Sequence, residues 1–148
     1  MKAFLVGFAV VAGLLNSVQA GYNASLGKSL GNAFAAAFAI VAVSFTTIVI
    51  AGTVSGRLAV PEWRAIAATP WWQWAGGVFA ALFVLSQLFV AEALGSALFM
   101  GLAVTAAIVM SLVLDHFGLA GFKEHAFGVG RAIGAALMIA GLSLIAWF

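Results

Sequence analysis

The sequence contains no cysteine and very little charge. Without cysteine, a disulfide framework, a thiolate metal site and a cysteine nucleophile are all excluded. Only 7% of the 148 residues are charged, whereas an ordinary soluble domain has about 25%. So few charges exclude a nucleic-acid binder. The two histidines show no metal-ligand spacing, so we expect neither a metal nor a cofactor.

Apolar residues dominate the chain. Hydrophobic residues make up 66% of it, and a soluble globule of this length could not bury that much apolar surface. A membrane-spanning helix needs about 20 mostly apolar residues. The sequence predicts an all-α integral membrane protein, a single five-helix transmembrane domain over 1–148. The five predicted spans are 3–21, 32–54, 71–91, 94–114 and 130–148.

The first span has a second interpretation. Lys2 and an apolar stretch are followed by Val18-Gln19-Ala20, a pattern that resembles the cleavage region of a secretory signal. We expect the segment to be retained as a span. The longest polar connector lies between the second and third spans, and there we expect one surface helical turn that begins at Pro61.

Basic residues are distributed unequally between the two ends of the predicted spans. Only Lys28 lies on one side, where its charge and that of Glu92 nearly cancel. Cytoplasmic loops collect Lys and Arg, so the N-terminus is predicted to be cytoplasmic, in a bacterial inner membrane. The five basic residues on the predicted cytoplasmic side are Lys2, Arg57, Arg64, Lys123 and Arg131.

Amide side chains form a stripe on the first span. Asn16, Gln19 and Asn23 have the spacing i, i+3, i+7, which places them within roughly 60° of arc on a helix. Polar side chains within a span are costly to expose to lipid. The stripe either faces a substrate path, where amides supply donors and acceptors, or forms hydrogen bonds between helices. Three amides on one stripe favour the path.

Other polar residues lie deeper in the third span and at its end. We expect Ser86 and Gln87 to line the same path. Glu92 is either an exposed carboxylate at the membrane surface or a proton-coupling group. Three hydroxyls of the second span are expected to bond to carbonyls of their own helix: Ser44, Thr46 and Thr47.

Asp115 and His116 end the fourth span, and Gly118 is expected to cap it in the left-handed conformation. A carboxylate at a helix C-terminus opposes the helix dipole by about 0.3–1 kcal/mol. Asp115 therefore needs a cationic partner from the basic side. Asp115 and His116 either order the following loop or relay protons, since histidine titrates near neutrality. We favour the ordering role.

Three glycines of the fifth span lie on one stripe. Gly130, Gly134 and Gly141 include one GxxxG step. Small residues at this spacing let helix backbones approach closely in membranes. We therefore expect a subunit contact on this face.

Several segments together resemble one transporter family. The order and spacing of these segments are similar to those of the short YdcZ-like transporters. That family belongs to the drug/metabolite transporter superfamily, with the EamA-like and small multidrug resistance transporters. The segments are 19–27 (a Q-x-x-x-N-x-x-L pattern), Pro70-Trp71-Trp72 with Gly76-Gly77, Leu94-Gly95, the run 114–121, and Gly134 with Gly141.

The resemblance implies a five-helix unit that is half of an inverted-repeat transporter. Two such units would pair antiparallel, with the substrate path between them. It also implies that Gln19 and Asn23 face the path and that Asp115 and His116 order the loop before the last helix. The sequence departs from the family pattern at Ala106-Ala107, where a Gly-Gln step is usual. It departs again after Phe45, where a glycine is missing.

These observations predict a transporter that moves a small metabolite across the lipid bilayer by alternating access. The small multidrug resistance relatives use a first-helix glutamate for proton exchange, whereas this helix carries only amides. We therefore favour a neutral, zwitterionic or anionic substrate. The expected partner is a second copy or an oppositely oriented paralogue. The alternative is a non-transporting subunit of a larger complex. We do not expect an enzyme, although Asp115 and His116 leave a minor intramembrane-enzyme hypothesis.

The charge bias predicts a single orientation in the membrane. Single-cysteine variants Ser25→Cys and Ser55→Cys test this with a membrane-impermeant thiol reagent on intact cells and inverted vesicles, because the chain has no other cysteine. We expect Ser25→Cys to react only from the outer face and Ser55→Cys only from the cytoplasmic face. Labelling of both variants from both faces would instead show a dual-orientation protein.

Overall fold

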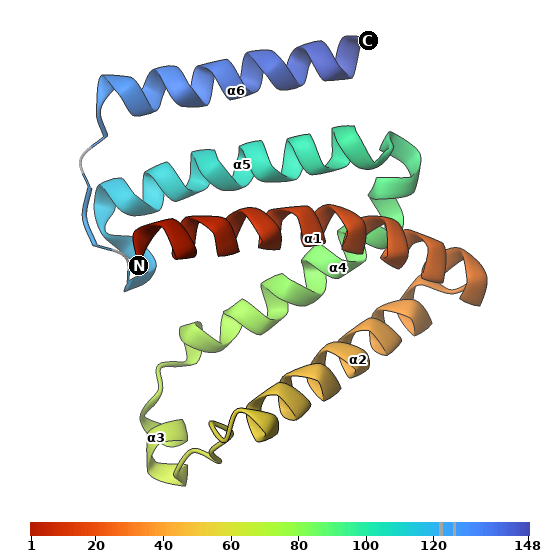
Figure 1. Cartoon of the computed structure of the whole chain (residues 1–148), viewed down its shortest axis with the longest axis vertical. Coiled ribbons are helices and arrows are strands. Elements are labelled where there is room, and N and C mark those ends of the chain that lie inside the picture. Colours follow the sequence, from red (N-terminus) through yellow and green to blue (C-terminus); the bar gives the residue numbers. More distant parts are fainter. Residues whose placement is uncertain (122, 126) are drawn as a thin grey trace. The chain divides into compact units, whose positions relative to one another are not determined.

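The fold is entirely helical across the described residues. The computed structural model describes residues 1–121, 123–125 and 127–148. These include five helices that are long and apolar enough to cross a membrane, which confirms the predicted all-α membrane architecture. Two compact units make up the chain: unit 1, Met1–Glu92, and unit 2, Ala93–Phe148 (Figure 1). The single domain expected over 1–148 stays a prediction.

The first helix of unit 1 is longer than the sequence suggested. Helix α1 spans Lys2–Leu30, whereas the predicted span ended at Gly21. The polar residues after Gly21 shorten the apolar run but do not break a helix. The helix ends only at Gly31, whose φ of 62° is left-handed. At about 1.5 Å per residue, α1 is about 44 Å long and therefore exceeds the thickness of the hydrocarbon core.

Helix α2, Ala33–Val54, follows after a tight turn and agrees with the predicted second span. Asn32 is its N-cap, and its side-chain oxygen accepts hydrogen bonds from the backbone N–H groups of Phe34 and Ala35, at 2.9 and 3.0 Å. The cap supplies partners for two N–H groups that the helix itself cannot satisfy. The short turn makes α1 and α2 antiparallel neighbours.

The connector after α2 contains the short helix α3, Trp63–Ala68. The predicted surface turn is therefore present, but the expected start at Pro61 is wrong. Glu62 is the N-cap and has an extended ψ of 142°, so Pro61 lies outside the helix. The third span then begins with a 3-10 turn, η1, at Trp71–Trp74 and continues as α4, Ala75–Leu94.

The three long helices of unit 1 are packed at one end. They converge near the turn between α1 and α2 and diverge toward the N-terminus of α1 (Figure 1). At the packed end, Leu88 of α4 lies in a core with Ala36 and Ile40 of α2. Phe34 and Phe89 add an edge-to-face contact with ring centroids 6.1 Å apart. The buried residues of unit 1 gather there: Ala20, Asn23, Ala36, Ile40, Gln87, Leu88 and Ala91.

Unit 2 is a pair of packed helices. Helix α5, Ser96–Phe117, is followed by the 3-10 turn η2, Leu119–Gly121, and by α6, Val129–Trp147. The two helices approach closely at Gly101, where an added Cβ would lie 2.5 Å from Cδ1 of Leu142. A side chain at this position would therefore force Leu142 to move.

The predicted glycine stripe lies on α6. A Cβ added at Gly130, Gly134 or Gly141 would meet nothing within 4 Å. Contacts among the described residues therefore leave room for side chains at these positions. The subunit contact expected on this face stays a prediction.

Candidate functional site

A cavity of about 450 Å³ lies between the three long helices of unit 1. This volume is within the range of small-molecule sites, about 300–1,000 Å³. Helix α1 contributes Asn16 and Gln19, and α2 contributes Ser44. The remaining lining is apolar and mostly small: Val41 of α2, and Gly77, Ala80, Ala81, Phe83 and Val84 of α4.

The wall of α4 explains why there is space at this level. Gly77, Ala80 and Ala81 have at most a methyl side chain, so the α4 backbone faces the amides of α1 without filling the gap. Asn16 and Gln19 are one turn apart on α1 and lie on the same face. The structure therefore brings two of the three predicted amides into one polar wall. Their side chains supply N–H donors and carbonyl acceptors to the cavity.

Ser44 lines the cavity, although its hydroxyl was expected to bond to a carbonyl of its own helix. Thr46 and Thr47 do bond to their own helix, through the carbonyls of Ala42 and Val43 at 2.8 Å each, which confirms that expectation for both. Ser44 instead lines the cavity. Its helical register could have revealed this, because it follows Val41 by three residues on the face that packs toward α1 and α4.

The third amide of the stripe has a different environment. The Asn23 side-chain N–H donates to Oε1 of Gln87 at 2.6 Å, and the two side chains are 6% and 0% exposed. The structure thus brings together two predicted pathway residues as a buried pair, one turn beyond the cavity lining. Nε2 of Gln87 has no hydrogen-bond partner among the described residues. An unsatisfied buried donor costs about 1–3 kcal/mol.

The other predicted residues of the third span lie outside this lining. The Ser86 hydroxyl donates to the carbonyl of Phe83 at 2.7 Å, so it bonds to its own helix. Glu92 accepts an ion pair from Lys28, with Nζ and Oε1 3.0 Å apart and side chains 51% and 61% exposed. Exposed pairs of this kind contribute little stability, about 0–1 kcal/mol.

Asp115 of unit 2 has the cationic partner that its position requires. Oδ2 of Asp115 lies 3.8 Å from Nη1 of Arg131, one of the basic residues expected to compensate it. Gly118 ends α5 in the left-handed conformation, with φ 59° and its N–H bonded to the carbonyl of Leu114, as predicted. The pairing joins the end of α5 to the start of α6.

His116 and Asp115 also hold the segment before α6. Nδ1 of His116 accepts the backbone N–H of Phe127 at 3.2 Å, and the Asp115 carbonyl accepts the N–H of His125 at 2.8 Å. The first contact requires an unprotonated Nδ1. Both residues thus contact backbone groups of this segment, which is the geometry of the ordering role.

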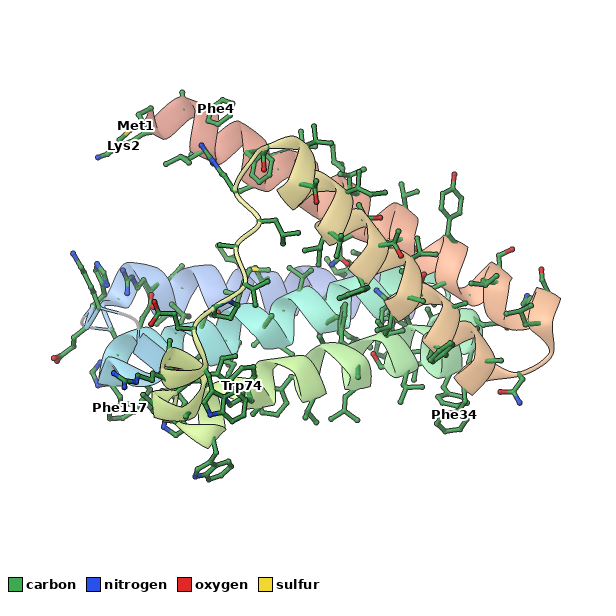
Figure 2. All side chains as sticks on the ribbon, turned by 90° about the horizontal axis from the view of Figure 1, so that it is seen from below. Met1, Lys2, Phe4, Phe34, Trp74 and Phe117 are labelled. Atoms are coloured by element: carbon green, nitrogen blue, oxygen red, sulfur yellow. The ribbon has the colours of Figure 1, made fainter. Side chains whose placement is uncertain are left out.

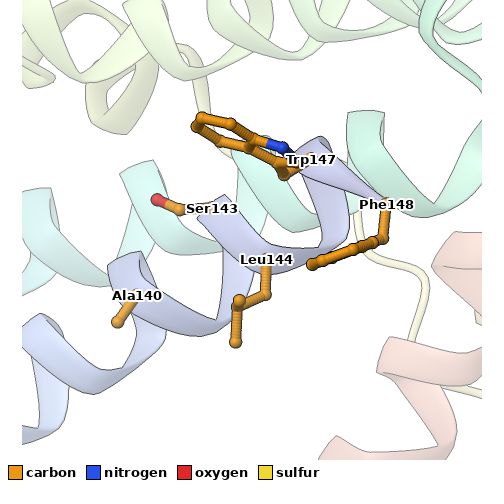
Figure 3. Close-up of a pocket in the computed structure, with 5 residues that line it drawn as sticks. All are labelled: Ala140, Ser143, Leu144, Trp147 and Phe148. Carbon is orange, nitrogen blue, oxygen red and sulfur yellow. The ribbon is translucent and has the colours of Figure 1, made fainter.

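A second cavity, of about 460 Å³, lies at the C-terminal end of α6 and is lined by the last turns of that helix and by Phe148, which follows it (Figure 3). Its lining is mostly apolar: besides the indole N–H of Trp147 it includes the hydroxyl of Ser143, which donates to the carbonyl of Ile139 at 2.9 Å. Binding sites normally combine an apolar wall with a few convergent polar groups. This surface has no such convergence, and the cavity of unit 1 is the better candidate.

The family comparison agrees with a transport role. Residues 4–144 match the family model "Putative inner membrane exporter, YdcZ". The chain belongs to the YdcZ family. This YdcZ-family protein is a membrane transporter of the drug/metabolite type and a multi-pass inner membrane protein. An exporter family is consistent with a protein that is not an enzyme. No curated protein and no solved structure matches the chain.

The buried amide pair makes a testable contribution to stability. Asn23→Leu and Gln87→Leu each leave one buried amide without its partner, so each should lower the free energy of unfolding by about 1–3 kcal/mol. The double variant should lose less than the sum of the two single variants, because it leaves no unpaired amide. Thermal unfolding in detergent, followed by circular dichroism, measures these changes.

Ser86→Ala is the matched control, since it removes a neighbouring hydroxyl that donates to a carbonyl of its own helix. Its effect should stay within about 0.5 kcal/mol. A double variant whose loss in the free energy of unfolding equals the sum of the two single losses would contradict a coupled pair.

Proposed function

We propose that this protein carries a small metabolite across the inner membrane by alternating access, with the cavity of unit 1 as its binding site. The observation that supports the proposal is the convergence of Asn16, Gln19 and Ser44 on a cavity whose other walls are apolar. A site of this kind can orient a small polar solute and shield it from lipid.

Among neutral, zwitterionic and anionic solutes, the lining favours those without a net charge. The amides present N–H donors, which suit carboxylate or carbonyl oxygens, and carbonyl acceptors, which suit hydroxyl or ammonium groups. An isolated ion is expensive to bury without a counter-charge, and the lining residues carry none. Neutral and zwitterionic solutes therefore fit best. Amides do not titrate, so proton exchange does not take place on Asn16 or Gln19.

A complete transporter would contain two of these chains in antiparallel orientation. The five-helix unit would then be half of an inverted repeat, with the path between the halves. The glycine face of α6 has room for close contact with a second helix. The five-to-one bias of basic residues supports an oppositely oriented paralogue as the partner, and a second copy of this chain is the other option.

The same glycine face supports a second candidate function, a non-transporting subunit of a larger complex. Co-purification with an unrelated enzyme would favour it. A neighbouring gene for a homologue with the opposite charge bias would favour the transporter.

Transport by the purified protein in liposomes tests the proposal. A panel of small neutral, zwitterionic and anionic metabolites is loaded, and efflux is followed with the protein alone and with its paralogue. Asn16→Leu and Gln19→Leu each remove an amide from the cavity and should lower the initial rate about two- to tenfold, the effect of one lost hydrogen bond.

Gln73→Leu is the matched control, since Gln73 lies in η1 outside the cavity and its replacement should leave the rate unchanged. Failure to move any solute of the panel would reject the proposed function. Equal rates for the parent chain and both cavity variants would reject the proposed site.

A further inference from the structure

Two side-chain pairs connect α1 to α4 at the same end of unit 1. The inner pair is Asn23 with Gln87, 2.6 Å apart, and the outer pair is Lys28 with Glu92, 3.0 Å apart. Both pairs join residues 64 positions apart in the sequence, so the two helices run in the same direction here. Along each helix the two pairs are five positions apart, about 7.5 Å along the axis.

A close helix contact lies between the two pairs. A Cβ added at Gly27 would stand 3.0 Å from Cδ2 of Leu88, so α1 presents bare backbone to α4 at this point. Leu88 also belongs to the core with Ala36 and Ile40 of α2. The two pairs thus enclose an apolar layer to which the three long helices of unit 1, α1, α2 and α4, all contribute.

These contacts lie directly beyond the cavity. Asn23 follows the lining residue Gln19 by one turn of α1, and Gln87 follows the lining residue Phe83 by one turn of α4. At the opposite end the chain segments are separated, as Figure 2 shows for Phe4 of α1 and Trp74 of η1, which directly precedes α4. The first 15 residues of the chain are exposed. The cavity is therefore closed at one end and unsealed at the other.

The inner pair has hydrogen-bonding capacity that the closed arrangement does not use. Oε1 of Gln87 accepts from Asn23, while its buried Nε2 has no partner in the described part of the chain. An oxygen of a solute that moves from the cavity toward this pair can accept hydrogen bonds from the side-chain N–H groups of Asn23 and Gln87. Separation of the pair would then exchange one set of hydrogen bonds for another instead of leaving both amides bare in an apolar layer.

We propose that these two pairs, the α1–α4 latch, close the transport cavity at the end of the α1–α2 turn, and that a solute bearing a hydrogen-bond acceptor passes this end by taking over the bonds of Asn23 and Gln87. The proposal rests on the proposed transport function, because it assigns a means of access control to the same cavity.

Thiol accessibility tests the latch without a transported solute. Gln19→Cys places the only cysteine of the chain in the cavity. A membrane-impermeant maleimide is applied from each face, and the rates are normalised to Ser25→Cys and Ser55→Cys, which report orientation at the two ends. We expect labelling at residue 19 from the face that bears Ser55 and protection from the face that bears Ser25.

Opening the latch should remove this protection. Adding Asn23→Leu and Lys28→Glu should raise labelling of Gln19→Cys from the Ser25 face about tenfold, because both pairs are lost. Lys28→Glu alone should give part of the rise, and combining it with Glu92→Lys should restore protection by reversing the ion pair. This rescue separates a specific opening from misfolding.

Ser29→Ala is the control next to Lys28, since the Ser29 hydroxyl donates to the carbonyl of Ser25 in its own helix. It should leave the rates unchanged. Equal labelling of Gln19→Cys from both faces in the parent chain would overturn the latch, as would no rise in the latch variants or no rescue by Glu92→Lys. Because labelling needs no substrate, a latch that fails in a protein that still transports would reject this inference and leave the proposed function intact.

Discussion

A polar group within a membrane-spanning helix must find a partner in the protein or in water, because the hydrocarbon offers none. This constraint separates the polar residues of unit 1 into three groups. Thr46 and Thr47 bond to their own backbone. Asn23 and Gln87 bond to each other across two helices. The third group, which includes Asn16 and Gln19, lines a cavity.

The packing of unit 1 makes the two ends of this cavity different. Tight contact between α1, α2 and α4 needs small residues at the interface, and it is found at the end that carries Gly27 and Ala36. Farther along, the small residues of α4 are opposed by amides and leave space between the helices. A polar cavity beside a packed, polar-bridged layer is the arrangement that an alternating-access carrier needs within one half of its structure. Opening and closing would then involve the same few side chains.

Much of the fold was predictable because hydropathy and helix capping act locally. The spans after the first were predicted within a few residues, and Gly118 capped α5 as expected. The end of α1 was not predicted, since loss of hydropathy was taken as loss of helix. Pro61 was placed inside a helix because the sequence does not show the extended backbone of Glu62.

The candidate site was predictable only in part. Helical spacing placed Asn16, Gln19 and Asn23 on one stripe. The spacing within a single helix does not show which of these amides meets a polar side chain of another helix. That choice depends on the level at which α4 crosses α1, a tertiary property that pairs Asn23 with Gln87. Ser44 was overlooked for a related reason, because a hydroxyl can always bond to its own helix. Only the position of α4 shows that this one faces a cavity.

If the cavity of unit 1 holds a polar solute, the part of α1 that carries Asn16 and Gln19 must be in contact with water. Spin labels at Asn16 and Gln19, compared with labels at the exposed Leu14 and Leu15, test it in lipid bilayers by electron paramagnetic resonance. We expect labels at Asn16 and Gln19 to collide mainly with a water-soluble nickel complex, and labels at Leu14 and Leu15 to collide mainly with oxygen dissolved in the lipid. Preferential collision with oxygen at all four positions would contradict it.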